Sequence, residues 1–232
     1  MERLPQLGLY RIATGTALIL GPALLLLDNV LHPKELERGN QGEQVGLIAD
    51  AYTRWQLAHA IGFVAILVFC AALLGLAFLV RRRQPLLGLI GGLLGLVGTL
   101  GFAAVITIDG FTWGVVGVTA ADPRIGAASA ASTLQVVQES RWALVYYLTT
   151  VGFVLGMVML AVGAARQGAV PAWASGLLVL AVLMVASETA IISNAYFIAG
   201  AAVFLVAGIV TALPILRMSD GEFARGGPAP AS

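Results

Sequence analysis

Long apolar stretches separated by short polar segments make up most of the chain. Six stretches stay apolar over roughly 20 residues, the length at which an α-helix crosses a ~30 Å hydrocarbon core. They lie near residues 9–31, 55–80, 86–108, 142–165, 172–193 and 196–216. Strands of a transmembrane barrel would instead alternate apolar and polar side chains in units of about ten residues. The pattern therefore predicts an all-α, polytopic integral membrane protein, a six-transmembrane-helix bundle.

Composition strengthens this prediction. Of the 232 residues, 59% are apolar and 11% are charged, whereas about a quarter are charged in a soluble domain, and the mean hydropathy is +0.93. The first apolar stretch follows Arg3 and Arg11 as a secretory signal would, but "LLLLDNVLHP" shows no small-residue cleavage pattern. The lone Cys70 excludes an intramolecular disulfide and a cysteine-based metal cage. The net charge of +1 argues against a nucleic-acid partner.

Two domains follow from the distribution of apolar residues. Residues 1–217 hold the predicted spans and form the six-helix transmembrane domain. The remaining residues, 218–232, include "SDGEFARGGPAPAS", which is small, polar and rich in glycine and proline. Such a composition is typical of a disordered end, so we expect a disordered cytoplasmic tail.

Arginines in the loops predict the orientation of the bundle. The side that holds both termini carries Arg3, Arg11, Arg81, Arg82, Arg83, Arg166, Arg217 and Arg225. The opposite side carries fewer basic residues, Lys34, Arg38, Arg54, Arg124 and Arg141, and also the acidic residues Glu35, Glu37, Glu43, Asp50, Asp122 and Glu139. Because Lys and Arg of short loops favour the cytoplasmic side, both termini are predicted to be cytoplasmic.

Two similar segments re-enter the membrane from the outer side. They are "RWQLAHAIGF" from Arg54 and "RWALVYYLTT" from Arg141. The similarity favours a duplicated helical hairpin in which spans two and three correspond to spans four and five. The alternative is that any re-entering helix selects Trp and Arg as interface anchors. The glycines at 88, 91, 92, 95, 98 and 101 predict that span three packs closely with its neighbours and lies centrally.

Ionisable side chains in the predicted spans are the strongest functional signal. A charge at the bilayer centre costs about 2.5 to 3.5 kcal/mol even on lenient insertion scales. At ~1.5 Å per residue, the candidates from four spans fall in the outer part of the bundle. They are Asp28, His32, His59, Asp109 and Glu188. Near the headgroups, solvation alone explains some of these residues, and hydrogen bonds between helices explain others.

Two carboxylic acids and an imidazole in apolar surroundings can hold different protonation states, as general acid and base catalysis requires. We assign Glu188 as buried acid or base, His59 as its proton partner, and Asp109 or Asp28 as orienter of the imidazole. The substrate-binding candidates are Trp55, Trp113, Arg141, Tyr146 and Asn194. The hypothesis is an enzyme or binding protein that acts on a lipophilic, isoprenoid- or lipid-like small molecule in an outer-leaflet pocket, for example by isomerisation or cyclisation.

Three other functions compete with this hypothesis. Metal or haem binding could use His32 and His59, but His32 precedes Pro33 and no HxxxH or CxxC spacing occurs, so we predict no metal and no cofactor. A proton-coupled transporter would place its ionisable residues near the midplane. A non-catalytic assembly or immunity factor would use polar residues only for packing. The expected partners are the lipid bilayer, a lipophilic small molecule and, as an open alternative, further copies of the chain.

The segments "YRIATGTALILGPALLLLDNVLHP" and "RWQLAHAIGFVAILV", with the glycine-rich third span, resemble small multi-pass proteins of unknown function from high-GC bacteria. The resemblance covers roughly the first half of the chain and rests on Asn29, His32-Pro33 and Trp55 to His59. It implies a bacterial inner (plasma) membrane and no particular activity.

Overall fold

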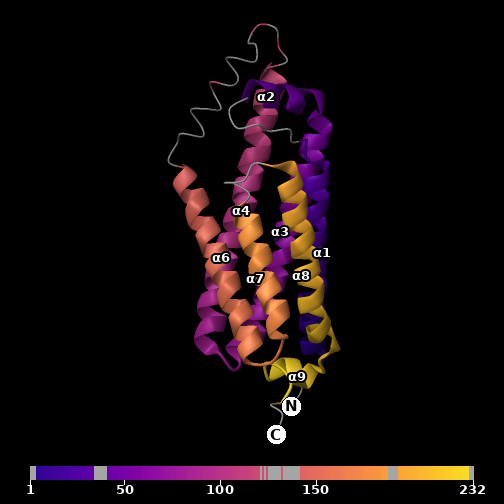
Figure 1. Ribbon diagram of the computed structural model, residues 1–232, viewed down its shortest axis with the longest axis vertical. Helices are drawn as coiled ribbons and strands as arrows, with labels where there is room; N and C mark the ends of the chain where they lie inside the picture. Colours follow the sequence, from indigo (N-terminus) through magenta and orange to yellow (C-terminus); the bar gives the residue numbers. More distant parts are fainter. Residues whose placement is uncertain are drawn as a thin grey trace.

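The protein is a bundle of long antiparallel helices (Figure 1). The computed structural model describes residues 4–33, 41–120, 122, 124, 132, 142–187 and 193–229. The long helices are α1 (Leu4–Leu31), α3 (Tyr52–Arg81), α4 (Pro85–Ala120), α6 (Trp142–Arg166), α7 (Ala172–Ser187) and α8 (Asn194–Arg217). Two short helices, α2 (Gln41–Asp50) and α9 (Asp220–Ala224), lie at opposite ends of the bundle. The described residues contain no β-strand, which confirms the all-α prediction.

Five of the described helices are long and apolar enough to cross a membrane: α1, α3, α4, α6 and α8. Helix α7 is apolar but has 16 described residues, or ~24 Å at 1.5 Å per residue, which is shorter than a ~30 Å core. The predicted fifth span continues into residues 188–192, which lie outside the described residues. The structure thus supports a helical membrane bundle, while the sixth span and the duplicated hairpin stay predictions.

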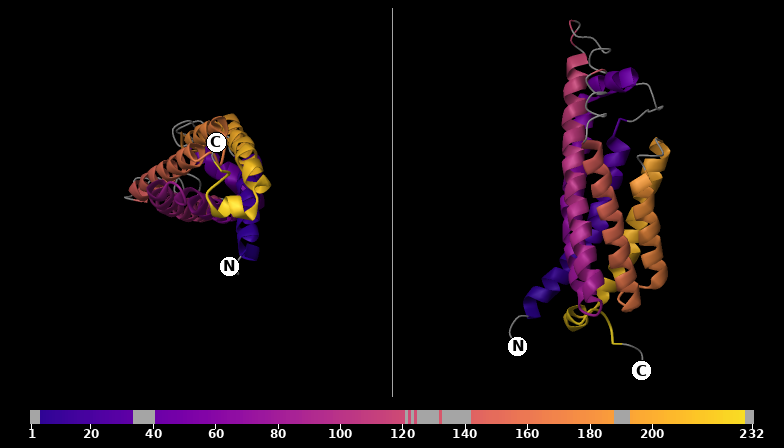
Figure 2. Two further views of the ribbon diagram at one scale, coloured as in Figure 1. Left: turned by 90° about the horizontal axis from the view of Figure 1, so that it is seen from below. Right: turned by 90° about the vertical axis from the view of Figure 1, so that its left-hand side faces the viewer.

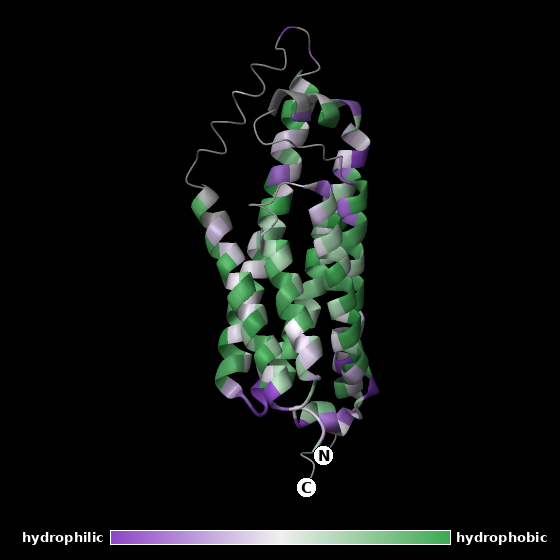
Figure 3. Ribbon diagram, viewed as in Figure 1, coloured by the Kyte–Doolittle hydropathy of each residue, from purple (hydrophilic) through white to green (hydrophobic). Residues whose placement is uncertain are grey.

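Apolar surface covers the shaft of the bundle, and polar residues gather at its two ends (Figure 3). The beginning of α1 and the end of α8 lie at the same end, beside α9 (Figures 1 and 2). We call this the terminal end, and the end that carries α2 the distal end. Apolar side chains that face outward from α3, α4 and α8 are thereby available to lipid, while polar groups meet water at both ends.

The buried core lies where α1, α3, α6 and α8 meet. Its fully buried side chains include Leu18, Leu73, Leu76, Met157, Leu160 and Ile215. Halfway along the helices, Phe69 contacts Phe153 and Phe204, with ring centroids 6.2 and 5.2 Å apart. The Phe102 ring lies 5.3 Å from that of Phe153. Edge-to-face arrangements of this kind are favourable for aromatic rings, and they fill the middle of the bundle with apolar atoms.

Helix α4 is peripheral rather than central, so the prediction from its glycines is wrong in this respect. Only 28% of its most apolar segment is buried, against 39% to 44% in the other four candidate spans. The glycines do pack closely, since a Cβ at Gly98 would overlap the backbone of Phe153 in α6. Leucines such as Leu89 and Leu93 point outward from the other faces. The small residues therefore fix close contacts with α3 and α6 without enclosing the helix.

The prediction of a disordered tail is wrong for residues 218–229. Ser219 and Glu222 form a capping box that begins α9, and the Phe223 side chain is fully buried, 5.6 Å from the Phe78 ring. Arg83 donates hydrogen bonds to the carbonyl oxygens of Arg225, Gly227 and Pro228. Arg11 pairs with Asp220 at 3.1 Å. One buried aromatic ring and two arginines hold a segment whose average composition predicts disorder.

Candidate functional site

The site is built at the distal end, where α1 ends, α3 begins and α4 passes beside both. Helix α1 ends at Leu31 because Pro33 disfavours helical geometry at His32. Gln44 of α2 donates a hydrogen bond to the Pro33 carbonyl oxygen at 3.3 Å. At ~1.5 Å per residue α4 is ~54 Å long, so its last turns extend beyond a hydrocarbon core and support α2. The end of α1 at Pro33 and the hydrogen bond from Gln44 of α2 therefore fix the backbone next to His32.

Trp55 is the structural centre of the site. Its side chain is only 2% exposed, and Nε1–H donates a hydrogen bond to the Gly110 carbonyl oxygen at 2.9 Å. The indole lies against both imidazoles, with centroids 4.5 Å from His32 and 4.2 Å from His59. Trp55 was expected to anchor α3 at the membrane surface. It is instead buried between helices and orients the two histidines.

Both ring nitrogens of His59 have partners. Nδ1 lies 3.0 Å from the Trp55 carbonyl oxygen one turn earlier in α3. Nε2 lies 3.2 Å from Oδ2 of Asp109 in α4. The ring can approach α4 so closely because residue 110 is glycine, where a Cβ would be 2.7 Å from the imidazole. The His59 side chain is 11% exposed and that of Asp109 is 46% exposed, so the pair joins the core to the surface.

The partners of His59 restrict what can lie between it and Asp109. A backbone carbonyl only accepts hydrogen bonds, so Nδ1 must carry the proton that it donates to Trp55. In a neutral ring Nε2 then presents a lone pair to the carboxylate of Asp109. Two acceptors that face each other at 3.2 Å need a positive charge between them. That charge is either a proton on the pair or a metal ion.

His32 joins His59 and Asp109 in a set of three side chains of the types that can ligate a metal ion. One donor atom each from His32, His59 and Asp109 lies within 4.8 Å of the other two. The two imidazole centroids are 4.9 Å apart. Imidazole nitrogen and carboxylate oxygen bind zinc at about 2.0 to 2.2 Å, which places neighbouring ligand atoms roughly 3 to 4 Å apart. Small side-chain rotations would bring the three donors to that spacing.

Asp28 lies beside this set without belonging to it. Its side chain is 8% exposed and rests on Gly62, where a Cβ would be 2.9 Å from the carboxylate. The site therefore holds one buried carboxylate on α1 and one half-exposed carboxylate on α4.

The other predicted site residues lie apart from His59 or outside the residues that the structure describes. Glu188 and Arg141 lie outside the described residues, and so does the side chain of Tyr146. Asn194 is exposed at the first residue of α8. Trp113 packs on Val45 of α2, above the histidines, in a small apolar cluster of its own. Of the proposed catalytic residues, the structure brings together Asp28, His59 and Asp109, and it adds His32.

Sequence reasoning missed the contacts that make this arrangement specific. The role of Gly110 as the surface on which His59 rests could be suspected only from its position directly after Asp109. The sequence places His32 and His59 at a similar depth, but no local pattern indicates that their rings meet, because the two residues are 27 positions apart. Below the site, the described core contains the phenylalanine cluster together with the buried threonines Thr99 and Thr149.

No known protein-family model, curated protein or solved structure matches the chain.

Proposed function

We propose that this protein binds one divalent transition-metal ion at the distal end of its bundle, through His32, His59 and Asp109. The observation that carries the proposal is the orientation of His59. Its Nδ1 lies at hydrogen-bond distance from the Trp55 carbonyl oxygen, its Nε2 faces Asp109, and His32 lies within ligand distance of both. The metal hypothesis, which the sequence disfavours, thereby becomes the preferred one.

The surroundings of His59 match the usual outer shell of a metal-binding histidine. Such a histidine donates its other ring N–H to a carboxylate or backbone carbonyl, which fixes the tautomer and the ring orientation. The Trp55 carbonyl supplies this acceptor. Trp55 itself is held by the Gly110 carbonyl, next to the proposed ligand Asp109. One hydrogen-bonded chain therefore links two of the three proposed ligands.

The donor set also selects the class of metal. Two imidazoles and one carboxylate suit Zn²⁺, Fe²⁺ and similar ions better than Mg²⁺ or Ca²⁺, which prefer oxygen ligands. Three protein ligands leave at least one coordination position for water or a substrate, as in catalytic rather than structural zinc sites. The half-exposed Asp109 gives this position access from the distal surface. A metal held there can activate water or polarise a bound group.

Acid and base catalysis on a lipophilic, isoprenoid- or lipid-like molecule is the second candidate function. The observation that favours it is the contrast between the buried Asp28 of α1, which rests on Gly62, and the half-exposed Asp109 of α4, which faces His59. Carboxylates in unlike environments are the usual basis of paired acid and base roles. Against it, both nitrogens of His59 are engaged within the protein, so the imidazole must turn before it can exchange a proton with a substrate.

A carrier function receives less support. A proton or solute that left the site toward the terminal end would meet the cluster of Phe69, Phe102, Phe153 and Phe204. Intramembrane proton relays use chains of Asp, Glu and His, whereas the buried polar side chains described in the middle of the bundle are threonines such as Thr99 and Thr149. The same aromatic packing is compatible with a protein that works at one membrane surface.

The orientation and span number complete the proposal. We infer six crossings of a bacterial plasma membrane with the terminal end in the cytoplasm. An even number of crossings is supported by the position of both described ends of the chain at one end of the bundle. The arginines at that end, among them Arg81, Arg82 and Arg83, favour the cytoplasmic side. The metal site then faces outward.

Metal analysis of purified protein tests the proposed function. After exposure to Co²⁺ and removal of unbound ion, we expect one cobalt per chain and a visible absorption band typical of nitrogen and oxygen ligands. His59→Ala and His32→Ala should each lower the affinity by more than the roughly 10- to 100-fold that loss of an outer-shell partner costs. Asp109→Asn should weaken binding by at least about tenfold.

Asp122→Asn is the matched control, because Asp122 is a distal-end carboxylate that pairs with Arg124 rather than with a histidine. It should bind cobalt as the parent protein does. Cobalt retained equally by all variants would reject the site. Loss of folding in His59→Ala without metal binding by the parent protein would favour a structural His59–Asp109 pair. A Soret absorption band would show that the protein binds haem rather than a single metal ion.

A further inference from the structure

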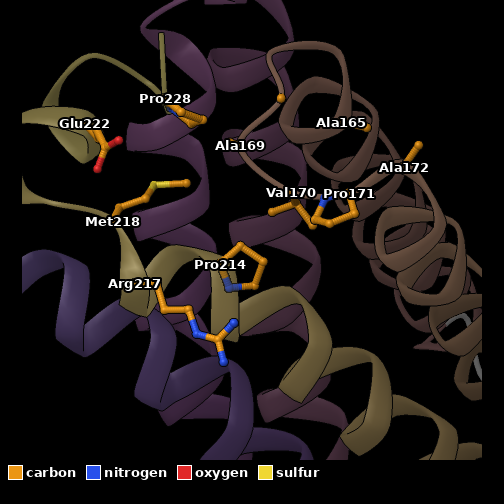
Figure 4. Close-up of a pocket in the computed structure, with 11 residues that line it drawn as sticks. Ala165, Ala169, Val170, Pro171, Ala172, Pro214, Arg217, Met218, Glu222 and Pro228 are labelled. Atoms are coloured by element: carbon orange, nitrogen blue, oxygen red, sulfur yellow. The ribbon is translucent and has the colours of Figure 1, made fainter. Parts of the chain in front are cut away.

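A cavity of about 480 Å³ opens at the terminal end, far from the histidines (Figure 4). Its walls come from the loop that joins α6 to α7, from the end of α8, and from the segment that carries α9. The volume lies within the ~300 to 1,000 Å³ range of small-molecule sites. The C-terminal segment forms one wall because Arg83 holds it against the bundle. Arg83 donates hydrogen bonds to the carbonyl oxygens of Gly227 and Pro228, and also to that of Gln167 in the α6–α7 loop.

The lining is apolar except for two charges of opposite sign. Ala169, Val170, Pro171 and Met218 are among the apolar members. The charged members are Arg217, at the end of α8, and Glu222, in α9. Arg217 forms no ion pair with any residue in the described part of the chain, whereas Arg11 nearby pairs with Asp220.

Glu222 is a fixed negative charge. Its Oε2 accepts hydrogen bonds from the backbone N–H and the hydroxyl of Ser219, at 2.7 and 2.8 Å. The backbone hydrogen bond, followed by the hydroxyl, holds the pKa of Glu222 below its ordinary value. Both of these hydrogen bonds use Oε2, so Oε1 can accept from another group.

The position of the cavity suits contact with lipid headgroups. Its lining residues belong to the terminal end, and at this end the apolar shaft of the bundle gives way to polar residues (Figure 3). Trp173, which follows the lining residue Ala172, is 64% exposed, as tryptophans at a membrane surface commonly are. Toward the middle of the bundle, exposed apolar side chains of α7 and α8, such as Leu180 and Leu213, offer a surface for acyl chains.

We propose that this cavity binds the headgroup of a phosphatidylethanolamine molecule from the adjacent leaflet. Arg217 would contact the phosphate, as guanidinium groups commonly do, and Oε1 of Glu222 would accept a hydrogen bond from the ammonium group. One cation and one anion suit a zwitterion better than an anionic headgroup. The residues that line the cavity include no aromatic ring, whereas quaternary ammonium groups such as choline are recognised by aromatic cages.

Native mass spectrometry of the protein from mixed vesicles tests this assignment. The vesicles hold equal amounts of phosphatidylethanolamine, phosphatidylcholine and phosphatidylglycerol with the same acyl chains. We expect phosphatidylethanolamine to be retained several-fold more than the other two lipids. Arg217→Gln should remove most of this retention, and Glu222→Gln should remove the preference over phosphatidylglycerol.

Two features keep the result interpretable. Glutamine can replace glutamate in a capping box, so Glu222→Gln leaves α9 able to form, and its melting temperature should match the parent's. Arg166→Gln is the control, because Arg166 is an exposed arginine of the same end that does not line the cavity. Equal retention of phosphatidylethanolamine and phosphatidylcholine, or equal effects of Arg217→Gln and Arg166→Gln, would overturn the proposal. The cobalt measurement is independent of it.

Discussion

At the scale of single residues, the depth of an ionisable group could be predicted and its partner could not. Counting residues along α1 and α3 places Asp28 and His59 in the same part of the bundle because helical rise is nearly constant. Which atom of His59 meets Asp109 depends on how α3 rotates about its axis and on the space left by Gly110. That rotation follows from packing along the whole helix, which no local pattern specifies.

Trp55→Phe tests the residue that holds the site together. The substitution removes the N–H that donates to the Gly110 carbonyl, worth roughly 1 kcal/mol, and shrinks a ring that both histidines contact. We expect the free energy of unfolding in detergent to fall by about 1 to 3 kcal/mol, because the smaller ring leaves a void. Trp173→Phe, at an exposed position, should stay within about 0.5 kcal/mol of the parent. Equal effects of the two substitutions would contradict this role for Trp55.

At the scale of helices, the sequence predicts where a helix exists better than where it lies. Continuous apolar runs predict α1, α3 and α8 because burying unpaired backbone groups in lipid is prohibitive. The glycines of α4 predict close contacts but not which helices make them, and the contacts with α3 and α6 leave the leucine faces exposed. The sequence did not predict helix α9, because this helix depends on one buried ring, Phe223, within a polar segment.

The glycine contact between α4 and α6 can be tested by adding one methyl group. A Cβ at Gly156 would overlap the backbone of Gly95, so Gly156→Ala must push the helices apart. Overpacking of this kind costs typically ~1 to 3 kcal/mol, and we expect a lower melting temperature in detergent. Gly176→Ala in α7 is the control, since no atom lies within 4 Å of the added Cβ. Unchanged melting of Gly156→Ala would show that the two helices are not locked together.

At the scale of the molecule, charge asymmetry between the two ends makes orientation testable. In a Cys70→Ala background, single cysteines at Gln84 and at Asp122 report on the terminal and distal ends. We expect a membrane-impermeant maleimide added to intact cells to label the Asp122→Cys protein and not the Gln84→Cys protein, because arginines retain the terminal end in the cytoplasm. Permeabilised cells, in which both should react, control for accessibility. Labelling of Gln84→Cys in intact cells would reverse the orientation.

The burial of Trp55 between two imidazoles has a practical consequence. The chain has 4 tryptophans, and this indole touches both histidines. A paramagnetic ion held by those rings would lie within a few ångströms of an excited indole and quench its emission. The protein would then carry its own optical reporter, so occupancy could be followed in sealed vesicles without a dye, with ion added to one face at a time.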